Sequence, residues 1–451
     1  CGLSCAGYVG VCGLYGYVAV YVGWYCCACG AAITVGSVQY YMGCMWLVDE
    51  DLSILCSLHM WAVWGWYDEN SNEYGLPIMC AVCRGSRNFS EKRNTHVSAV
   101  KLWLKGETSK ACDVWEDILV DNPLDMLALK FAHDSYFYLA YHPQMRDGIA
   151  RVIPHWKKSM PLYGYLYGMY AFGLEETNLY DRAEKTARMS LDINRHDAWA
   201  THAMAHVFEM GGRQDEGLQF MSATENDWNV CGMIACHDYW HYALYNLEKG
   251  NYSDAVGLYD TQVGPLAAKS GAMLDMVDAC SLLYRLQLEG VNVGDRYKDI
   301  QDVCRQHLDD HVLAFNDAHF MMSCIGAGDK VSTEKLLESM RNFVKNGKGY
   351  NCDVTTEVGL ALCESLVAYD NGDYAKAVDL VSPVRYQVIK IGGSHAQRDI
   401  FNQFLVHCAM KSDTEEHKKL ARQLLVERKC LKENSPLTDR LMAKAMVQHT
   451  G

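Results

Sequence analysis

Lysine and arginine are absent from the first 83 residues, and residues 1–48 contain no charged side chain of either sign. All 41 basic residues lie further along the chain, where acidic residues outnumber them, and the formal net charge is −14 at pH 7. A protein that binds nucleic acid neutralises phosphates with clustered lysine and arginine. This distribution argues against nucleic acid as a partner.

The sequence also lacks the patterns of several common catalytic sites. It has no GxxxxGK[ST] phosphate-binding loop and no GxSxG nucleophile elbow. Cys236 is adjacent to His237, but neighbouring residues of a helix point in different directions, which argues against a cysteine–histidine catalytic pair. We therefore assign no catalytic residue, and we favour a protein that is not an enzyme.

The first ninety residues differ in composition from the rest of the chain. Ten of the 20 cysteines occur before residue 84, among many glycines and tyrosines. Three alternatives stay open for this atypical segment, residues 1–90: a segment foreign to the domain that follows, a disordered segment, or a membrane-inserting segment. An uncharged run of about 18 residues is long enough to span a bilayer. The many glycines and tyrosines count against insertion, so we do not expect a membrane partner.

The other ten cysteines lie singly between Cys112 and Cys430. Isolated cysteines within helical patterns are typical of buried, reduced thiols and not of a disulfide framework, which favours a cytoplasmic location. Among the earlier cysteines, two CxxC pairs begin at Cys26 and Cys80, about fifty residues apart. That separation is too long for a compact zinc ribbon, so no zinc site is expected there.

From about residue 91 the sequence favours helices, with few prolines and with apolar residues spaced three and four apart. A recurring pattern places a turn residue five positions before a small residue; the turn residues are Gly106, Asn178, Gly212, Gly250 and Gly372. Glycine or asparagine ends a helix in the left-handed conformation, and the small residue lets the next helix fold back closely. A second small residue stands seven positions before each turn, where two antiparallel helices would cross: Ala99, Ala171, Ala205, Ala243 and Ser365.

The interval from residue 178 to residue 212 is 34 residues, the usual period of the tetratricopeptide repeat. One hairpin cannot bury its apolar face alone, so successive hairpins must stack. The sequence therefore predicts an all-α domain over residues 91–451, an α-solenoid of stacked antiparallel helical hairpins built from divergent tetratricopeptide-like repeats. We expect a looser break at residues 345–353 and a last helix that begins at Pro436, with Ser435 as its N-cap.

Several longer stretches of this domain resemble the family of tetratricopeptide repeat protein 38. They are "HVSAV", "MLALKFAHDSYFYL", "CHDYWHYALYNLEKG", "FNDAHF", "GGSHAQRDIFNQ" and "NSPLTDRL", and they run in the family's order from about residue 91 to the end of the chain. The resemblance does not extend upstream of residue 91. It implies an all-helical, divergent repeat protein in the cytosol, without an assigned enzymatic activity.

In a tetratricopeptide-like hairpin the first helix lines the concave face of the array, and its groove positions fall 13, 10, 6 and 3 residues before the turn. This rule and the flanking residues on the same helices predict a ligand groove lined by Tyr165, Phe172, Glu175, Trp199, His202, His206, Glu209, His237, Trp240 and His241. His133 and His319 belong to other first helices and are candidates for the same groove.

The histidines of this set also permit a second interpretation. His202, His206 and Glu209 lie at i, i+4 and i+7 on one helical face, as in a two-histidine, one-carboxylate metal site, and His237 and His241 extend the set. The stretch "HDYWH" imitates the HExxH zinc motif, with Asp238 in place of the glutamate. Hydrogen-bonded structural histidines are a third alternative.

Two functions from different classes follow. The leading hypothesis is a scaffold that binds a peptide or partner protein in its concave groove without a cofactor, with Trp199 and Trp240 as anchors. The alternative is a metal-dependent hydrolase or oxygenase, with zinc or iron held inside the solenoid. The metal-dependent enzyme requires that the four histidines converge within metal-ligand distance, whereas the peptide-binding scaffold does not.

Overall fold

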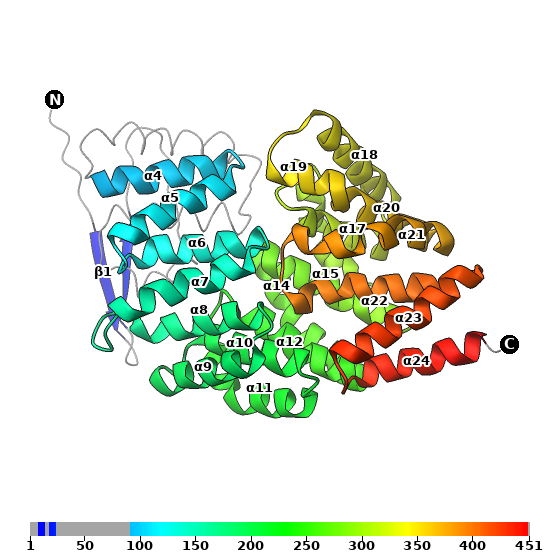
Figure 1. The fold of residues 1–451 in the computed structure, drawn as a ribbon, viewed down its shortest axis with the longest axis horizontal. Helices are drawn as coiled ribbons and strands as arrows, with labels where there is room; N and C mark the ends of the chain where they lie inside the picture. The colour runs from blue at the N-terminus through cyan, green and yellow to red at the C-terminus, as the bar shows by residue number, and fades with distance from the viewer. Residues whose placement is uncertain (1–7, 14–17, 24–90, 450–451) are drawn as a thin grey trace. The chain divides into compact units, whose positions relative to one another are not determined.

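The computed structural model describes residues 8–13, 18–23 and 91–449 (Figure 1). The chain divides into two compact units, Cys1–Ser57 and Leu58–Gly451. In the first unit, strands β1 (Tyr8–Gly13) and β2 (Val18–Gly23) pair antiparallel, with Tyr8 opposite Gly23 and Gly13 opposite Val18. This hairpin was not predicted, although its valines and tyrosines suit a strand. The all-α prediction concerned the domain that begins at residue 91, and the part of it that the structure describes, residues 91–449, contains helices and no strand.

Most of the segment from residue 1 to residue 90 lies outside the described residues. The predictions made for this segment, including disorder and membrane insertion, therefore fall mostly on residues that the structure does not describe. Within the described part of the chain, no helix combines the length and the hydropathy that crossing a bilayer requires.

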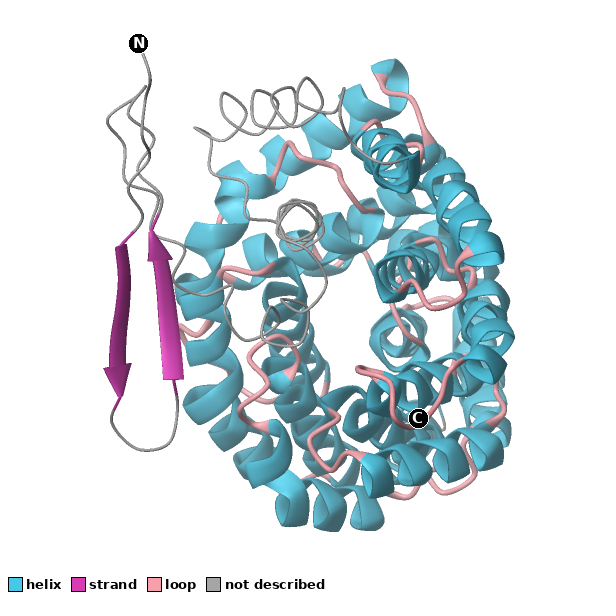
Figure 2. Cartoon of the chain, turned by 90° about the vertical axis from the view of Figure 1, so that its left-hand side faces the viewer, coloured by secondary structure: helices cyan, strands magenta, loops and turns pink. Residues whose placement is uncertain are grey.

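Residues 91–449 form helices joined by short turns (Figure 2). The first of them are α4 Glu91–Leu104, α5 Thr108–Asp121, α6 Met126–Tyr138, α7 His142–Val152, η2 Ile153–His155, α8 Tyr163–Glu175, α9 Tyr180–Ile193, α10 Ala198–Met210, α11 Gln214–Trp228, α12 Ala235–Lys249 and α13 Tyr252–Leu258. A π-helical turn, η3 Tyr259–Val263, leads into α14 Gly264–Ser270, α15 Met273–Leu288, α16 Tyr297–Cys304, η4 Arg305–His307, α17 Ala314–Gly326 and α18 Lys330–Asn346. The last are α19 Tyr350–Val354, η5 Thr355–Gly359, α20 Leu360–Asp370, α21 Tyr374–Val381, η6 Ser382–Ile391, α22 His395–Lys411, α23 Glu415–Leu431 and α24 Pro436–His449.

The predicted turn residues adopt the left-handed conformation. The φ angles are 75° at Gly106, 60° at Asn178, 66° at Gly212, 83° at Gly250 and 79° at Gly372. The small residues predicted at the helix crossings are fully buried: Ala99, Ala171, Ala205, Ala243 and Ser365. Local sequence thus determines where each of these helices ends and where the next one packs against it.

The predicted break and the predicted last helix are both present. Helix α18 ends at Asn346, and α19 begins at Tyr350 after a left-handed Gly349. Ser435 caps α24, because its Oγ accepts the backbone N–H of Thr438 at 3.1 Å. The ten cysteines from Cys112 to Cys430 are free thiols, and most of them are buried, as their isolated positions predicted.

Helices α8, α10 and α12 lie side by side, and α12 also packs on α15. Helix α22, far along the chain, packs on α15 and reaches α10. One contact that joins these distant segments is the hydrogen bond from Arg285 Nη2 on α15 to the carbonyl of Ala396 on α22, at 2.8 Å. As a result, most of α10 and α12 is buried on every side, and this environment surrounds the histidines.

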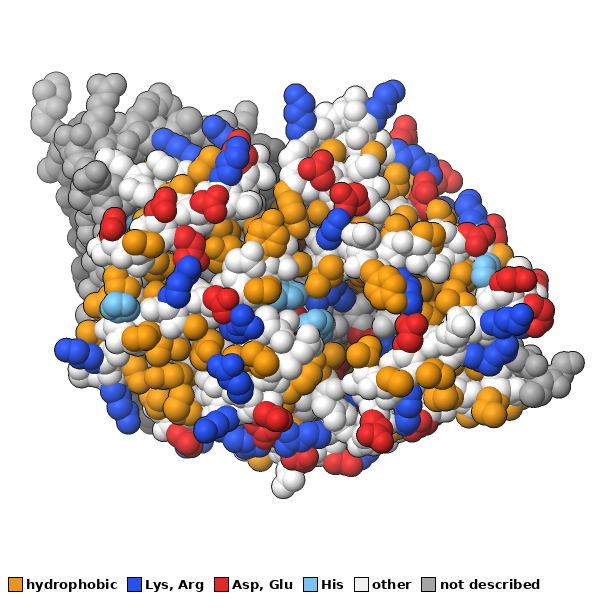
Figure 3. All heavy atoms as spheres, in the orientation of Figure 1, with side chains coloured by type: hydrophobic (Ala, Val, Ile, Leu, Met, Phe, Trp, Pro, Cys, Tyr) orange, Lys and Arg blue, Asp and Glu red, His pale blue; other side chains and the backbone are white. Residues whose placement is uncertain are grey.

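The surface of the face shown in Figure 3 mixes lysine and arginine with aspartate and glutamate. No extended basic patch is visible on the described part of this face. The absence of a nucleic-acid partner stays a prediction from composition.

Candidate metal centre

Four histidines from two neighbouring helices converge at one point. His202 and His206 lie on α10, and His237 and His241 lie on α12. One ligand atom from each of these four rings lies within 4.8 Å of the others. The i, i+4 spacing places each pair on one face of its helix, and the side-by-side packing of α10 and α12 turns the two faces toward each other. We call these four residues the histidine cluster.

Burial favours the uncharged form of three of the rings, those of His202, His206 and His241. The exposed fractions are 3% for His202, 0% for His206, 3% for His237 and 0% for His241. Burial, followed by the neighbouring histidines, holds the pKa values of His202, His206 and His241 well below the usual range. A neutral imidazole is the form that binds a metal ion.

Three of the rings face a carboxylate through Nδ1. His237 Nδ1 donates to Asp278 Oδ2 at 2.6 Å, and His241 Nδ1 donates to Glu209 Oε2 at 3.0 Å. His206 Nδ1 lies 3.5 Å from Glu175 Oε2. Hydrogen on Nδ1 leaves a lone pair on Nε2 of the neutral ring, and this carboxylate–histidine arrangement orients metal ligands in many proteins.

Several ring nitrogens of the cluster have no hydrogen-bond partner in the described part of the chain, and His206 Nδ1 is one of them because Glu175 is too distant to accept its hydrogen. His241 Nε2, His202 Nδ1 and His206 Nδ1 are buried without a hydrogen-bond partner among the described residues. His202 Nε2 lies 2.8 Å from His206 Nε2, so at most one of these two nitrogens can donate to the other. Leaving a buried polar atom unsatisfied costs about 1–3 kcal/mol. The donor set therefore fits a metal ion better than it fits a closed hydrogen-bond network.

The two glutamates beside the rings differ from ordinary surface glutamates. Burial raises the pKa of Glu209 to about 7, and burial together with the neighbouring Glu176 raises the pKa of Glu175 well above its usual value. A nearby dication would favour the ionised form of both.

A second group of titratable side chains surrounds Glu176, which follows α8. Its Oε2 lies 3.3 Å from His395 Nδ1, 3.6 Å from His142 Nε2 and 3.6 Å from Arg398 Nη2. Burial alone would raise the pKa of Glu176, but His395, His142 and Arg398 together hold it below the usual value. Because the guanidinium already balances this carboxylate, the group is a buried ion-pair network that ties α7 and α8 to α22 and is a poorer cation site than the histidine cluster.

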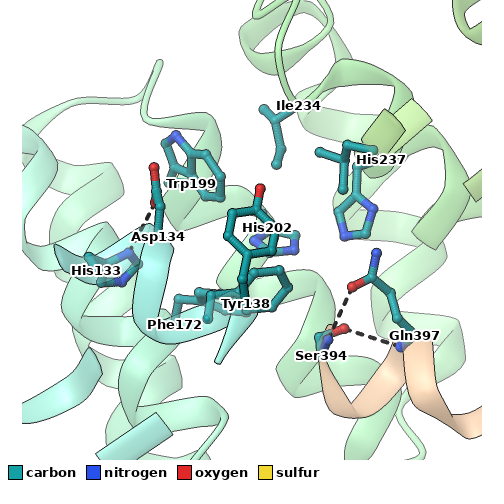
Figure 4. Close-up of a pocket in the computed structure, with 12 residues that line it drawn as sticks. His133, Asp134, Tyr138, Phe172, Trp199, His202, Ile234, His237, Ser394 and Gln397 are labelled. Atoms are coloured by element: carbon teal, nitrogen blue, oxygen red, sulfur yellow. Dashed lines mark hydrogen bonds and ion pairs between the residues drawn. The ribbon is translucent and has the colours of Figure 1, made fainter. Parts of the chain in front are cut away.

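A small cavity of about 30 Å³ lies beside the cluster (Figure 4). Its lining comes from α6, α8, α10, α12, α15, α22 and the turns before α12 and α22, and comprises His133, Asp134, Phe137, Tyr138, Phe172, Trp199, His202, Ile234, His237, Leu274, Ser394 and Gln397. In Figure 4, Phe172 and Trp199 lie on one side and His237 and Gln397 on the other, with His202 between them. The cavity thus reaches two members of the cluster.

A capping box holds the α22 side of the cavity in place. Ser394 Oγ accepts the backbone N–H of Gln397 at 3.1 Å, and Gln397 Oε1 accepts the backbone N–H of Ser394 at 3.0 Å. Gln397 Nε2 also donates to Asp278 Oδ1 at 3.3 Å. The same aspartate therefore orients His237 and anchors the start of α22.

The predicted site residues fall into three groups. His133, Phe172, Trp199, His202 and His237 line the cavity. His206, His241 and Trp240 are fully buried; the Trp240 ring stacks on His237 with centroids 5.1 Å apart. The remaining predicted residues do not line the cavity. Glu175 and Glu209 contact rings of the cluster, and Tyr165 is half-buried on α8. His319 on α17 packs between Phe315 of the same helix and Phe401 of α22.

The structure differs from the sequence predictions in two respects. The four histidines do not form an open groove surface, because α15 and α22 cover the faces of α10 and α12 that carry them. Glu209 does not complete a two-histidine, one-carboxylate ligand set with His202 and His206. It contacts His241 Nδ1 instead, because α12 places the His241 ring next to the Glu209 carboxylate.

Sequence reasoning missed Asp278, which is 1% exposed and contacts the cluster from α15. A signal for it exists in the stretch "MLDMVDACSLLYRL", where Asp275 and Asp278 are the two acids of an otherwise mostly apolar helix. Such acids are almost never fully buried unless they have a partner.

No known protein-family model matches this chain.

Proposed function

We propose that the histidine cluster binds one first-row transition-metal ion, zinc or iron, and that the chain is a metal-dependent hydrolase or oxygenase. The observation that supports this most directly is the convergence of four buried imidazoles within 4.8 Å, several of whose ring nitrogens lack a partner among the described residues. This function is the alternative that the sequence left open.

The ligand chemistry narrows the choice of ion. Neutral imidazole suits zinc, copper, iron and nickel, whereas magnesium and calcium require oxygen ligands. Zinc binds histidine nitrogen at about 2.0–2.1 Å, so four ligands of a tetrahedral ion are about 3.3 Å apart. Small rotations of the rings would bring the cluster to that spacing from its present separation of 4.8 Å or less.

The cavity favours a reactive centre over a purely structural one. A structural zinc site is closed, while a catalytic site keeps a position for water or substrate. His202 and His237 line the cavity, so an ion held by the cluster would be reached from that side. Zinc there would activate water for hydrolysis, and iron would support oxygen chemistry.

We also propose that residues 91–449 form a divergent tetratricopeptide-like solenoid of the kind that the resemblance implies. The left-handed turn residues and the buried small residues at the crossings support this arrangement. Binding of a peptide or partner protein, in the cytoplasm, is the second candidate function. Its best support is Trp199, which is half-buried at the cavity, in contrast to the fully buried Trp240.

Metal analysis of tag-free protein tests the first proposal. The purified chain is dialysed against excess Zn²⁺ or Fe²⁺, then against metal-free buffer, and its metal content is measured by mass spectrometry. We expect about one ion per chain. The variants His206→Ala and His241→Asn should lose it.

His319→Ala is the matched control, because His319 is equally buried at 1% exposed but lies outside the cluster. It should keep the metal ion. Circular dichroism confirms that each variant is folded. Less than stoichiometric metal in the folded parent chain, or equal loss in His319→Ala, would refute a metal centre at the cluster.

A further inference from the structure

We propose that Ser339 is a nucleophile activated by His311 and Asp317, and that this second site accepts the acyl group of small carboxylic esters. Ser339 belongs to α18, His311 to the turn before α17 and Asp317 to α17 itself. None of these elements carries a histidine of the cluster, so the inference is independent of the proposed metal centre. It is carried by the order of the hydrogen bonds that join the three side chains.

The three side chains form one hydrogen-bonded line. His311 Nδ1 lies 3.2 Å from Asp317 Oδ1 and 3.3 Å from Oδ2, and His311 Nε2 lies 2.8 Å from Ser339 Oγ. A carboxylate beside Nδ1 holds the ring hydrogen there and leaves the lone pair of Nε2 to accept the hydrogen of the serine hydroxyl. In this arrangement a histidine acts as the general base for a serine nucleophile.

The backbone and the neighbouring side chains hold His311 in one position. Its φ angle is 45°, a left-handed value that residues other than glycine seldom adopt, and such strain is concentrated at functional sites. Asn351 Nδ2 donates to the His311 carbonyl, and the Phe343 ring stacks on the imidazole with centroids 5.0 Å apart. Phe343 and Ser339 are four residues apart on α18, so one face of this helix both holds the imidazole and presents the hydroxyl to it.

The surrounding acids make the imidazole a stronger base. Burial would lower the pKa of His311, but the hydrogen bond to Asp317 and the nearby Asp309 and Asp310 raise it above the usual value. A general base is most effective when its pKa lies near the working pH. Asp317 is buried, so its carboxylate stays committed to the ring and is not drawn into water.

A cation lies beside the serine hydroxyl. Lys335 is one turn before Ser339 on α18, and its Nζ lies 2.6 Å from Asp309 Oδ2. Burial would raise the pKa of Asp309, but hydrogen bonds from Lys335 and Ser339 lower it. The ionised carboxylate thus holds the ammonium group near the hydroxyl, where the ammonium would stabilise the negative charge that develops on an ester carbonyl oxygen.

A second serine–histidine–aspartate set differs from this one in its burial. Ser412 Oγ lies 2.8 Å from His417 Nδ1, and His417 Nε2 lies 3.3 Å from Asp379 Oδ1. There the serine is buried and the aspartate side chain is 72% exposed. At the proposed site the serine is half-buried and the aspartate is buried. Only the second order lets an ester reach the nucleophile while a fixed carboxylate orients the base.

The reaction has two steps in which atoms and electrons balance. Ser339 Oγ bonds to the carbonyl carbon of the ester, and its proton passes to His311 Nε2 and then to the leaving alkoxide as the ester C–O bond breaks. Water then attacks the acyl-serine with the same base and releases the carboxylic acid. Asp317 is a positioning residue, because it acts only through the imidazole.

Covalent labelling and ester hydrolysis test the proposal. The full chain is first dialysed against EDTA, so that no metal ion at the histidine cluster contributes. Phenylmethanesulfonyl fluoride sulfonylates activated serines, and trypsin releases Ser339 as the single serine of the peptide "LLESMR", residues 336–341. We expect a stoichiometric adduct on this peptide and steady hydrolysis of p-nitrophenyl acetate, and Ser339→Ala should lose both.

His311→Asn removes the base but keeps a residue that tolerates a left-handed backbone, and it should slow both reactions by about 100-fold or more. Asp317→Asn should lower kcat and leave KM unchanged, because Asp317 acts on the base and not on the ester. Ser412→Ala is the matched control and should leave both reactions unchanged. Circular dichroism confirms that each variant is folded. A parent chain without an adduct on Ser339, or equal rates in folded His311→Asn, would overturn the proposal.

Discussion

Replacing Asp278 by asparagine should weaken metal binding without unfolding the chain. Asp278 Oδ2 accepts the Nδ1 hydrogen of His237 at 2.6 Å, and the two side chains are 1% and 4% exposed. Asparagine keeps an oxygen that can accept this hydrogen but removes the negative charge that makes the ring a better donor to a metal ion. Loss of such an outer partner typically reduces metal affinity about 10- to 100-fold, or about 1.4–2.7 kcal/mol.

Competition with a chromophoric zinc chelator at constant pH measures this change. Asp317→Asn is the matched control, since Asp317 is also 1% exposed and its Oδ1 accepts from His311 Nδ1 at 3.2 Å, outside the cluster. It should leave the affinity for zinc unchanged. The reasoning fails if folded Asp278→Asn binds zinc as tightly as the parent chain, or if both variants lose affinity equally.

Three further predictions concern stability. Zinc at 100 times its dissociation constant should raise the free energy of unfolding by about 2.7 kcal/mol, and EDTA should reverse the increase; unchanged urea midpoints would contradict specific binding. Burial raises the pKa of Asp197 to about 7 despite the hydrogen bond from Ser190 Oγ at 2.8 Å, against about 3.9 in an unfolded chain. Because the folded chain holds this proton more tightly than the unfolded chain, the free energy of unfolding falls by about 4 kcal/mol in total as the pH rises from about 4 to about 7. Asp197→Asn should abolish this loss, and urea titrations across the same pH range measure it. Gly217→Ala should destabilise the fold by about 1–3 kcal/mol, because its Cβ would lie 2.5 Å from the Tyr245 ring, whereas Gly257→Ala, with no described atom within 4 Å, should be neutral or stabilising. Thermal denaturation compares the two glycine variants, and equal melting temperatures would argue against the close packing at Gly217.

Much of the helical domain could be predicted because its signals are local. Gly106, Gly212 and Gly250 mark helix ends by a conformation that other residues seldom adopt, and the structure places each of them there. The position of Ala205 seven residues before a turn predicted its burial at a helix crossing. The hairpin of β1 and β2 escaped prediction because its short strands carry no clear alternation of apolar and polar residues.

The candidate site was predicted only in part. The spacing of His202 and His206 indicated a shared helical face, and so did that of His237 and His241. Glu209 was assigned to the ligand set because it continues the same face, yet it contacts His241 of the next helix. The resemblance to a repeat family suggested an open groove and gave no reason to expect the cover formed by α15 and α22.

The sequence by itself determined the helices, their left-handed ends and the pairing of the histidines, because these depend on backbone preferences and on the 3.6-residue period within a few turns. Only the tertiary structure decided that the two pairs meet, that Asp278 of α15 orients one ring and that Gln397 of α22 donates a hydrogen bond to the same aspartate. These contacts join residues 41 and 119 positions apart. Such contacts depend on how whole helices pack around a common core, and no local pattern in the chain encodes that packing.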